Sequence, residues 1–203
     1  MNFLAHSLFG YTDTALITGQ FCGDFVRGSD LSHLPRGIEV GIRLHRRMDA
    51  FTDAHEALKP AKVSLGADRR RVSGIIVDVM FDHWLAVNWS DFSDLGIDQH
   101  VAAVHRAVRT HDEYIPTELA RFMRFLHNEK VLESNGELEA IVVTLGRLST
   151  RSPRLASLAM KVEELEPLAR TLDAPFRTFY PELDAAASQF LQQYDYSPHE
   201  QRQ

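Results

Sequence analysis

The sequence predicts a single all-α domain over residues 1–193, followed from Tyr194 by a polar tail, 194–203, that is expected to fray. Three observations predict this class. Apolar residues recur at the three- and four-residue spacing of amphipathic helices along most of the chain. Alternating β-branched runs bounded by turns, which would indicate strands, are scarce. Proline and glycine residues fall between the periodic stretches, where helices are expected to end.

The predicted helices follow one another along the chain. Residues 12–14 (TDT) could cap a first helix that runs to about Arg27, with Gly28 as its stop. Pro35 stands near the start of a second helix, which continues past Phe51. Further helices are predicted at 70–89, 98–112, 117–133, 136–149, 153–172 and 174–193, with Pro116, Gly136, Pro153 and Pro175 near the breaks.

The composition is that of an ordinary globular protein. The 203 residues are 44% hydrophobic and 25% charged, which is enough apolar material to bury a core at this length. The net charge of −6 argues against a general nucleic-acid binder. Residues 1–10 lack the basic region of a secretory signal, and their apolar run is too short to span a membrane. The lone Cys22 is expected to fill the core, so the cytoplasm is the expected location.

Charge is distributed unevenly between the two halves. Residues 1–90 carry ten Lys/Arg and ten Asp/Glu, whereas residues 91–203 carry twelve against eighteen. Dense basic stretches nevertheless occur in the first half, at Arg43, Arg46, Arg47, Arg69, Arg70 and Arg71. These arginines either cover solvated helix faces or form a basic platform for an acidic partner.

Carboxylates inside apolar helical stripes are the most informative feature, because Asp and Glu are rarely buried without a partner or a metal. Asp78 and Asp82 interrupt the nearly continuous apolar run 74–87 at i and i+4, so both project from one face. Like charges at this spacing repel, and a bound hard cation would remove that cost. The alternative is that each carboxylate pairs with a separate arginine.

A second stripe leads into a histidine and an aspartate. Ile38, Ile42, His45 and Asp49 lie on one side of the helix predicted there. His45 and Asp49 could share a metal ion, or they could form a hydrogen-bonded pair that fixes one histidine tautomer.

Three other polar residues are candidates. Asp24 stands among apolar and small residues, where it could join the metal set or pair with Arg27 or a distant arginine. His6 is either a ligand or a satisfied core histidine. His83 points about 100° away from Asp82 on a helix, so it is not expected to bind the same ion. It could instead contact a metal-binding side chain and orient it, or act as a catalytic acid. The histidines of the acidic half are expected on the surface: His100, His105, His111, His127 and His199.

Oxygen and imidazole donors without a thiolate favour Mn²⁺, with Mg²⁺ or Fe²⁺ possible, over a structural zinc site. Such a site polarises a phosphoryl oxygen and activates water, so hydrolysis of a phosphate ester is the expected chemistry. No P-loop, dinucleotide fingerprint or serine-nucleophile motif is present. The predicted metal set is His6, Asp24, His45, Asp49, Asp78 and Asp82, and the predicted catalytic residues are Asp24 and His83.

Four blocks resemble the acyl carrier protein phosphodiesterase family: residues 1–6 (MNFLAH), 23–28 (GDFVRG), 41–53 (GIRLHRRMDAFTD) and 77–85 (VDVMFDHWL). Residues 151–155 (RSPRL) and 179–181 (FYP) extend the resemblance over nearly the whole chain. The resemblance implies a helical, cytoplasmic, Mn²⁺-dependent enzyme. Its substrate would be holo-acyl carrier protein, whose 4′-phosphopantetheine–serine phosphodiester it would hydrolyse.

The same resemblance implies a distant likeness to HD phosphohydrolases. The adjacent His-Asp of that pattern is absent, and only the reversed Asp82-His83 occurs. The metal ligands are therefore predicted from the helix faces on which they lie, and not from the HD pattern. With an acidic carrier as substrate, the arginines of the first half would steer and dock it. One rival is an HD-like phosphohydrolase acting on a nucleotide or other small phosphate ester, and another is a non-catalytic helical module that binds an acidic partner.

Overall fold

The computed structural model describes residues 3–10 and 12–198. The chain is helical there, without a strand, which confirms the predicted all-α class. The α-helices are α1 (Phe3–Leu8), α2 (Thr14–Cys22), α3 (Arg36–Ala54), α4 (Lys59–Ser64), α5 (Ser73–Val87), α6 (Ile97–Thr110), α7 (Thr117–Asn128), α8 (Leu138–Ser149) and α9 (Val162–Gln193). Short 3₁₀ turns lie between them: η1 (Glu56–Leu58), η2 (Ala67–Arg69), η3 (Trp89–Asp91), η4 (Asp112–Tyr114), η5 (Glu133–Gly136) and η6 (Pro153–Leu158).

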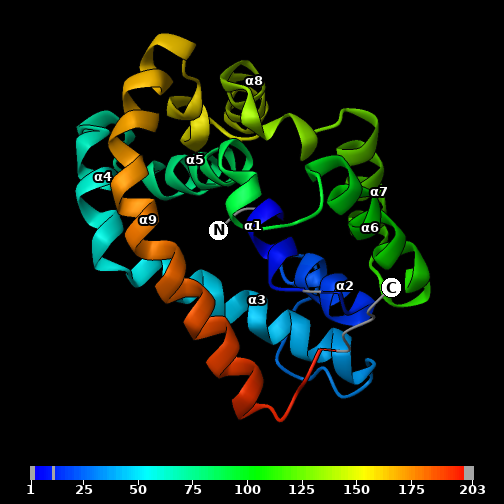
Figure 1. Ribbon diagram of the computed structural model, residues 1–203. Coiled ribbons are helices and arrows are strands. Elements are labelled where there is room, and N and C mark those ends of the chain that lie inside the picture. Colours follow the sequence, from blue (N-terminus) through cyan, green and yellow to red (C-terminus); the bar gives the residue numbers. More distant parts are fainter. Residues whose placement is uncertain (1–2, 11, 199–203) are drawn as a thin grey trace.

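The short helix α1 lies in the middle of the molecule, surrounded by the longer helices (Figure 1). It contacts α2 and α5, while α3 packs between α2 and α9. Helices α6 and α7 lie on the side opposite α9 (Figure 1). Within the described residues, no helix combines the length and the apolar composition needed to cross a membrane.

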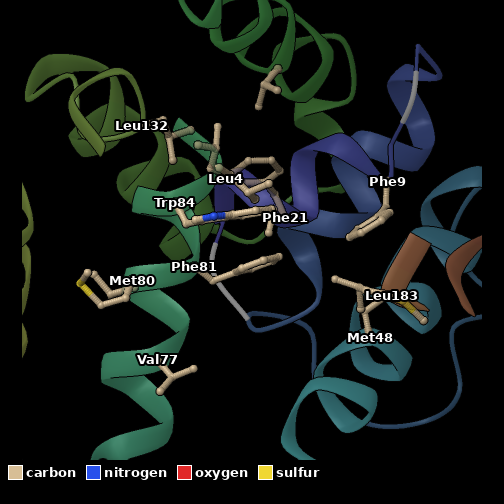
Figure 2. Close-up of a cluster of buried hydrophobic side chains, with 14 of the residues drawn as sticks. Leu4, Phe9, Phe21, Met48, Val77, Met80, Phe81, Trp84, Leu132 and Leu183 are labelled. Atoms are coloured by element: carbon tan, nitrogen blue, oxygen red, sulfur yellow. The ribbon is translucent and has the colours of Figure 1, made fainter. Parts of the chain in front are cut away.

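The core is one cluster of large apolar side chains. Figure 2 shows Leu4 and Phe21 beside Trp84 and Phe81 of α5, at the point where α1 meets its neighbours. Leu4 and Phe21 are completely buried. Burying such side chains contributes about 1.5–3 kcal/mol each, so this core can hold the short α1, which could not be stable alone.

Helices α2 and α3 cross at two glycines. A Cβ on Gly19 would collide with the backbone carbonyl of Ile38, and a Cβ on Gly41 would collide with that of Leu16. Only hydrogen at these two positions lets the backbones approach so closely. This crossing brings the end of α2 beside the polar residues of α3.

Helix α9 corrects the predicted break at Pro175. A helix over 153–172 and another over 174–193 were expected, but η6 covers 153–158 and one continuous helix follows. Pro167, Pro175 and Pro181 all lie inside it. An internal proline costs about 3 kcal/mol, and here the apolar stripe that packs on α3, α5 and α8 continues through it and offsets that cost. Its buried members are Leu165, Leu168, Leu172, Phe176, Phe179, Leu183, Ala187, Phe190 and Leu191.

Other helix ends also differ from the predictions. Asp13 caps α2 through its carboxylate, as the TDT cluster predicted, but α2 ends at Cys22 instead of Arg27. The first helix, α1, and the short α4 were not predicted. The chain after α9 contacts the fold at Tyr196, whose hydroxyl donates to Asp13 at 2.7 Å, and the predicted fraying of the tail stays a prediction.

Candidate metal centre

His6, His45 and Asp49 form a compact cluster. One ligand atom from each lies within 4.8 Å of the others, an arrangement that could hold a metal ion. The His6 Nε2 atom lies 3.1 Å from Oδ1 of Asp49, and the His45 Nε2 atom lies 3.1 Å from Oδ2 of the same carboxylate. The two imidazole rings stack with their centroids 3.8 Å apart. Two segments that are distant in the sequence thus bring three potential metal-ligand atoms to one point.

Each member is placed by a different feature of the fold. His6 comes from α1, whereas His45 and Asp49 come from α3, one turn apart on the same face. Gly23 ends α2 directly against the His45 ring, where a Cβ would collide with the imidazole. Gly23 has ordinary helical backbone angles, so space is what requires a glycine there.

Asp24 stands at the edge of the cluster. Its Oδ1 lies 3.2 Å from Nε2 of His45, but its side chain is 57% exposed. Asp24 is therefore more solvated than its apolar and small neighbours in the sequence suggested, because α2 ends before it. An exposed carboxylate beside a buried imidazole is well placed to meet a substrate.

The protonation of the cluster follows from burial and from these bonds. Burial, together with the nearby His45, lowers the pKa of His6 to about 4. Burial also opposes protonation of His45, but its bonds to Asp24 and Asp49 outweigh that effect and raise its pKa to about 9. Contact with the two histidines, and with His45 first, holds the pKa of Asp49 below its usual range despite burial.

The donor geometry fits a cation. Nδ1 of His6 lies 3.0 Å from the side-chain oxygen of Gln20, and the tautomer that donates to this oxygen leaves the lone pair of Nε2 facing the cluster. Nε2 of His45 has one hydrogen at most, yet two carboxylates lie within 3.2 Å of it. Its buried Nδ1 has no hydrogen-bond partner among the described residues. A cation shared by the two Nε2 atoms and Asp49 would satisfy more of these lone pairs.

Gln20 was not predicted as a site residue. It is completely buried within the apolar run of α2, and its oxygen orients the His6 ring. The signal was the same one that singled out the aspartates, namely a polar side chain at an apolar helical position.

Asp82 has a different place from the predicted one. Its two carboxylate oxygens accept the backbone N–H groups of Leu4 and Ala5, each at 2.9 Å. The carboxylate therefore holds the start of the helix that carries His6. Burial raises the pKa of Asp82 to about 7, although these two bonds partly offset the effect.

Asp78 lies one turn from Asp82 on α5 and is partly buried. Burial raises the pKa of Asp78, and the negative charge of Asp49 adds to the effect. Asp78 therefore lies close enough to Asp49 for their charges to interact. Among the described residues, neither Asp78 nor Asp82 belongs to the compact donor group. Their predicted role as metal ligands stays a prediction.

His83 contacts the backbone. Its Nδ1 donates to the carbonyl oxygen of Asn135 at 2.8 Å, which attaches η5 to α5. Burial lowers the pKa of His83. Its predicted role as an acid stays a prediction, and the contact with Asn135 favours a structural role. His100 and His105 are also buried, so the expectation that they lie on the surface is wrong, and His199 lies outside the described residues.

The predicted docking arginines fall into two groups. Arg43 bonds Glu39 on its own helix, Arg46 donates to backbone carbonyls of the loop after α2, and Arg69 bonds Glu164 of α9. These three arginines make contacts within the fold. The other three are exposed: Arg47, Arg70 and Arg71.

Beside the cluster lies a pocket of about 610 Å³ between α1, α7 and α8. Asp24 and Asp82 are among the residues that line it, and most of the others are apolar. A pocket of this size and character is typical of small-molecule sites.

Comparison with known proteins identifies the family. The sequence model described as acyl carrier protein phosphodiesterase matches residues 1–183. A relative from Yersinia pestis with that name is 35% identical over 183 residues, covering 89% of this chain and 94% of its own. Relatives of the same name from Salmonella dublin and Salmonella agona are 33% and 32% identical, each covering 93% of this chain and 98% of their own. No solved structure gave a significant match. The chain therefore belongs to the acyl carrier protein phosphodiesterase family of enzymes.

Proposed function

We propose that the protein hydrolyses the phosphodiester that joins 4′-phosphopantetheine to a serine of holo-acyl carrier protein. Water adds to phosphorus, the bond to the serine oxygen breaks, and the products are apo-carrier and free 4′-phosphopantetheine. The observation that carries the proposal is the convergence of His6, His45 and Asp49 on one point in a member of this family. The relatives' name supplies the substrate.

We further propose that the cluster holds Mn²⁺, with Mg²⁺ or Fe²⁺ as alternatives. Nε2 of His6, Nε2 of His45 and the Asp49 carboxylate would hold the ion, and the mixture of imidazole and carboxylate donors suits these metals. A cation there would supply positive charge to the phosphoryl oxygens and lower the pKa of water. The absence of a cysteine ligand argues against a structural zinc site.

Asp24 is our candidate for the residue that takes the proton of the attacking water. Its carboxylate is exposed, lies 3.2 Å from His45 and also lines the neighbouring pocket. The bond from His45 keeps the pKa of Asp24 low, so it is ionised at neutral pH and can accept a hydrogen bond from water.

The acidic carrier would dock through exposed arginines. Arg47, Arg70 and Arg71 have no ion pair among the described residues, so their charges are available to a partner. Charges at the edge of an interface mainly raise the association rate and make it sensitive to salt. The buried, unpaired Cys22 is consistent with a cytoplasmic enzyme.

The test measures the mass of the carrier. Purified protein is incubated with holo-acyl carrier protein and Mn²⁺, with EDTA in a parallel sample, and the carrier is weighed by intact mass spectrometry. We expect conversion from the holo to the apo mass, its loss in EDTA, and its loss in Asp49→Asn. An unchanged mass with bound carrier would instead favour a non-catalytic binding module.

The same assay tests docking and the rival substrate class. The double variant Arg70→Glu, Arg71→Glu should lower kcat/KM for the carrier at low salt, and the deficit should shrink as salt screens the charges. Its rate on a small phosphodiester, bis(p-nitrophenyl) phosphate, should equal that of the wild type. Fast cleavage of small esters without cleavage of the carrier would identify a general phosphohydrolase.

A further inference from the structure

The pocket beside the metal centre has an apolar wall that the hydrolytic reaction does not require. Its lining includes Phe3, Phe122, Phe125, Leu126, Val131 and Leu148, from α1, α7, α8 and the segment between α7 and α8. Several of these side chains are only partly buried, so their apolar surface faces the cavity. Partly exposed aromatic residues gathered around one hollow mark a binding site for an apolar group.

The wall is preassembled. The Phe3 and Phe122 rings lie 4.8 Å apart between centroids, and Phe25 lies 5.6 Å from Phe122. The Arg147 guanidinium covers the Phe125 ring at 5.1 Å while it pairs with Glu129. Contacts of this kind fix the rings before any ligand arrives, which lowers the entropy cost of binding.

The pocket adjoins the metal centre through a shared residue. Asp24 lines the pocket and also bonds His45, so a substrate phosphate at the cluster has the pocket as its neighbour. The prosthetic arm of a carrier extends from that phosphate and ends in a thiol, to which acyl groups attach as thioesters. The arm would enter the pocket first, where polar side chains such as Asn135 and Thr144 offer partners for its amides, and the apolar remainder of the lining fits a hydrocarbon chain beyond the thiol.

We propose that this pocket binds the acyl chain carried on the prosthetic arm, so that acylated carriers are preferred over holo-carrier. The inference rests on the proposed function, because it takes the carrier's phosphodiester as the group bound at the cluster. The arginines that line the pocket, Arg121, Arg147 and Arg151, are exposed and would add to the attraction that the docking arginines exert on an acidic carrier.

The acyl chain should change KM more than kcat. It contacts the enzyme equally before and during reaction, so its binding energy tightens the complex without speeding the chemical step. Each fully buried methylene contributes about 0.8 kcal/mol, so two carbons should lower KM by up to about fifteenfold until the pocket is full.

The experiment measures kcat and KM for holo-, butyryl-, octanoyl- and hexadecanoyl-carrier. In the wild type, KM should fall from holo- to octanoyl-carrier. Thr144→Trp places a large ring in the pocket and should abolish that dependence. Val143→Trp is the matched control, because Val143 is the preceding residue of α8 and is 50% exposed outside the pocket. It should keep the chain-length dependence.

A second measurement separates the pocket from the reaction. Octanoyl-pantetheine is titrated calorimetrically into each protein in EDTA, so neither a metal nor turnover is needed. We expect binding by the wild type and Val143→Trp, and none by Thr144→Trp. If Thr144→Trp does not fold, as judged by its circular dichroism melt, Leu148→Gln replaces it and makes the lining polar without added bulk.

The outcomes are distinct. A chain-length-independent KM in the wild type, or equal binding of octanoyl-pantetheine by all folded variants, would overturn the pocket assignment. Failure of the wild type to convert any carrier, combined with pocket-dependent binding of octanoyl-pantetheine, would overturn the proposed reaction and leave the acyl site standing.

Discussion

At the scale of single residues, Asp82 shows how one buried carboxylate can serve a site without touching its reacting atoms. It accepts the amides of Leu4 and Ala5 and so fixes the helix that carries His6. The repulsion between Asp82 and Asp78 is the cost of this arrangement. We infer that Asp82 acts as a positioning residue for the candidate metal centre.

Asp82→Ala is therefore expected to lower the free energy of unfolding by about 2–5 kcal/mol. The reason is that two buried amides lose their acceptor, at about 1–3 kcal/mol each, which exceeds any relief of repulsion from Asp78. Urea unfolding measures the loss, and carrier cleavage should fall with it. The control is Asp24→Ala, an exposed position, which should abolish cleavage with stability unchanged to within about 0.5 kcal/mol. Wild-type stability in Asp82→Ala would refute the positioning role.

At the scale of elements, the crossing of α2 and α3 determines whether the centre can form. Gly19 and Gly41 allow these helices to touch backbone to backbone, and the residues that follow the crossing include Gln20, Asp24 and His45. A shift of the two helices apart would separate Asp24 from His45, because each lies on a different side of the contact.

Gly19→Ala and Gly41→Ala should each destabilise the protein by about 1–3 kcal/mol and slow cleavage, since the added methyl collides with backbone that cannot rotate away. The control is Gly146→Ala in α8, where a Cβ meets nothing within 4 Å. That change should stabilise the protein by about 0.5–1 kcal/mol through helix propensity. Thermal melts and the carrier assay measure both effects. Equal behaviour of the three variants would show that the close crossing is not required.

The helical class and much of the cluster could be predicted from sequence, for identifiable reasons. Periodic apolar residues determine helices locally, and His45 and Asp49 are visible as polar residues on an apolar stripe of one helix. The role of Asp82 depends on a contact 78 residues away, which no local pattern contains. Pro175 locally favours a helix end, which is why the sequence predicts a break there. The packing that keeps α9 helical through this proline exists only in the folded molecule. The predicted likeness to HD phosphohydrolases stays a prediction.

At the scale of the whole molecule, buried ionisable groups act in opposite directions on stability. His100 lies beneath α1, bonded to Ser7 at 2.8 Å, and burial lowers its pKa to about 4. In the unfolded chain this histidine binds a proton near pH 6.5, whereas in the folded protein it binds one only near pH 4. The free energy of unfolding therefore falls as the pH drops from 6.5 towards 4. Asp82 has the opposite effect on the pH dependence of stability. Its pKa is raised, so the folded protein retains the proton of this carboxyl up to about pH 7.

His100→Gln should isolate the histidine contribution. The variant keeps a polar group for Ser7 but cannot titrate, so its loss of stability between pH 6.5 and pH 4 should be smaller than that of the wild type by up to about 3 kcal/mol. Urea unfolding across this pH range provides the measurement. His33→Gln, at an exposed position, should follow the wild type. Parallel pH curves for His100→Gln and the wild type would contradict the assignment.

The central position of α1 also has a consequence for biosynthesis. His6 leaves the ribosome before α5 does, and α1 is held by Asp82, which emerges 78 residues after Leu4. During translation α1 therefore remains an apolar segment without its Asp82 contact until α5 has been synthesised. A nascent chain that stalls before α5 would carry an incomplete candidate metal centre and an exposed hydrophobic segment, which is a form that chaperones and proteases recognise.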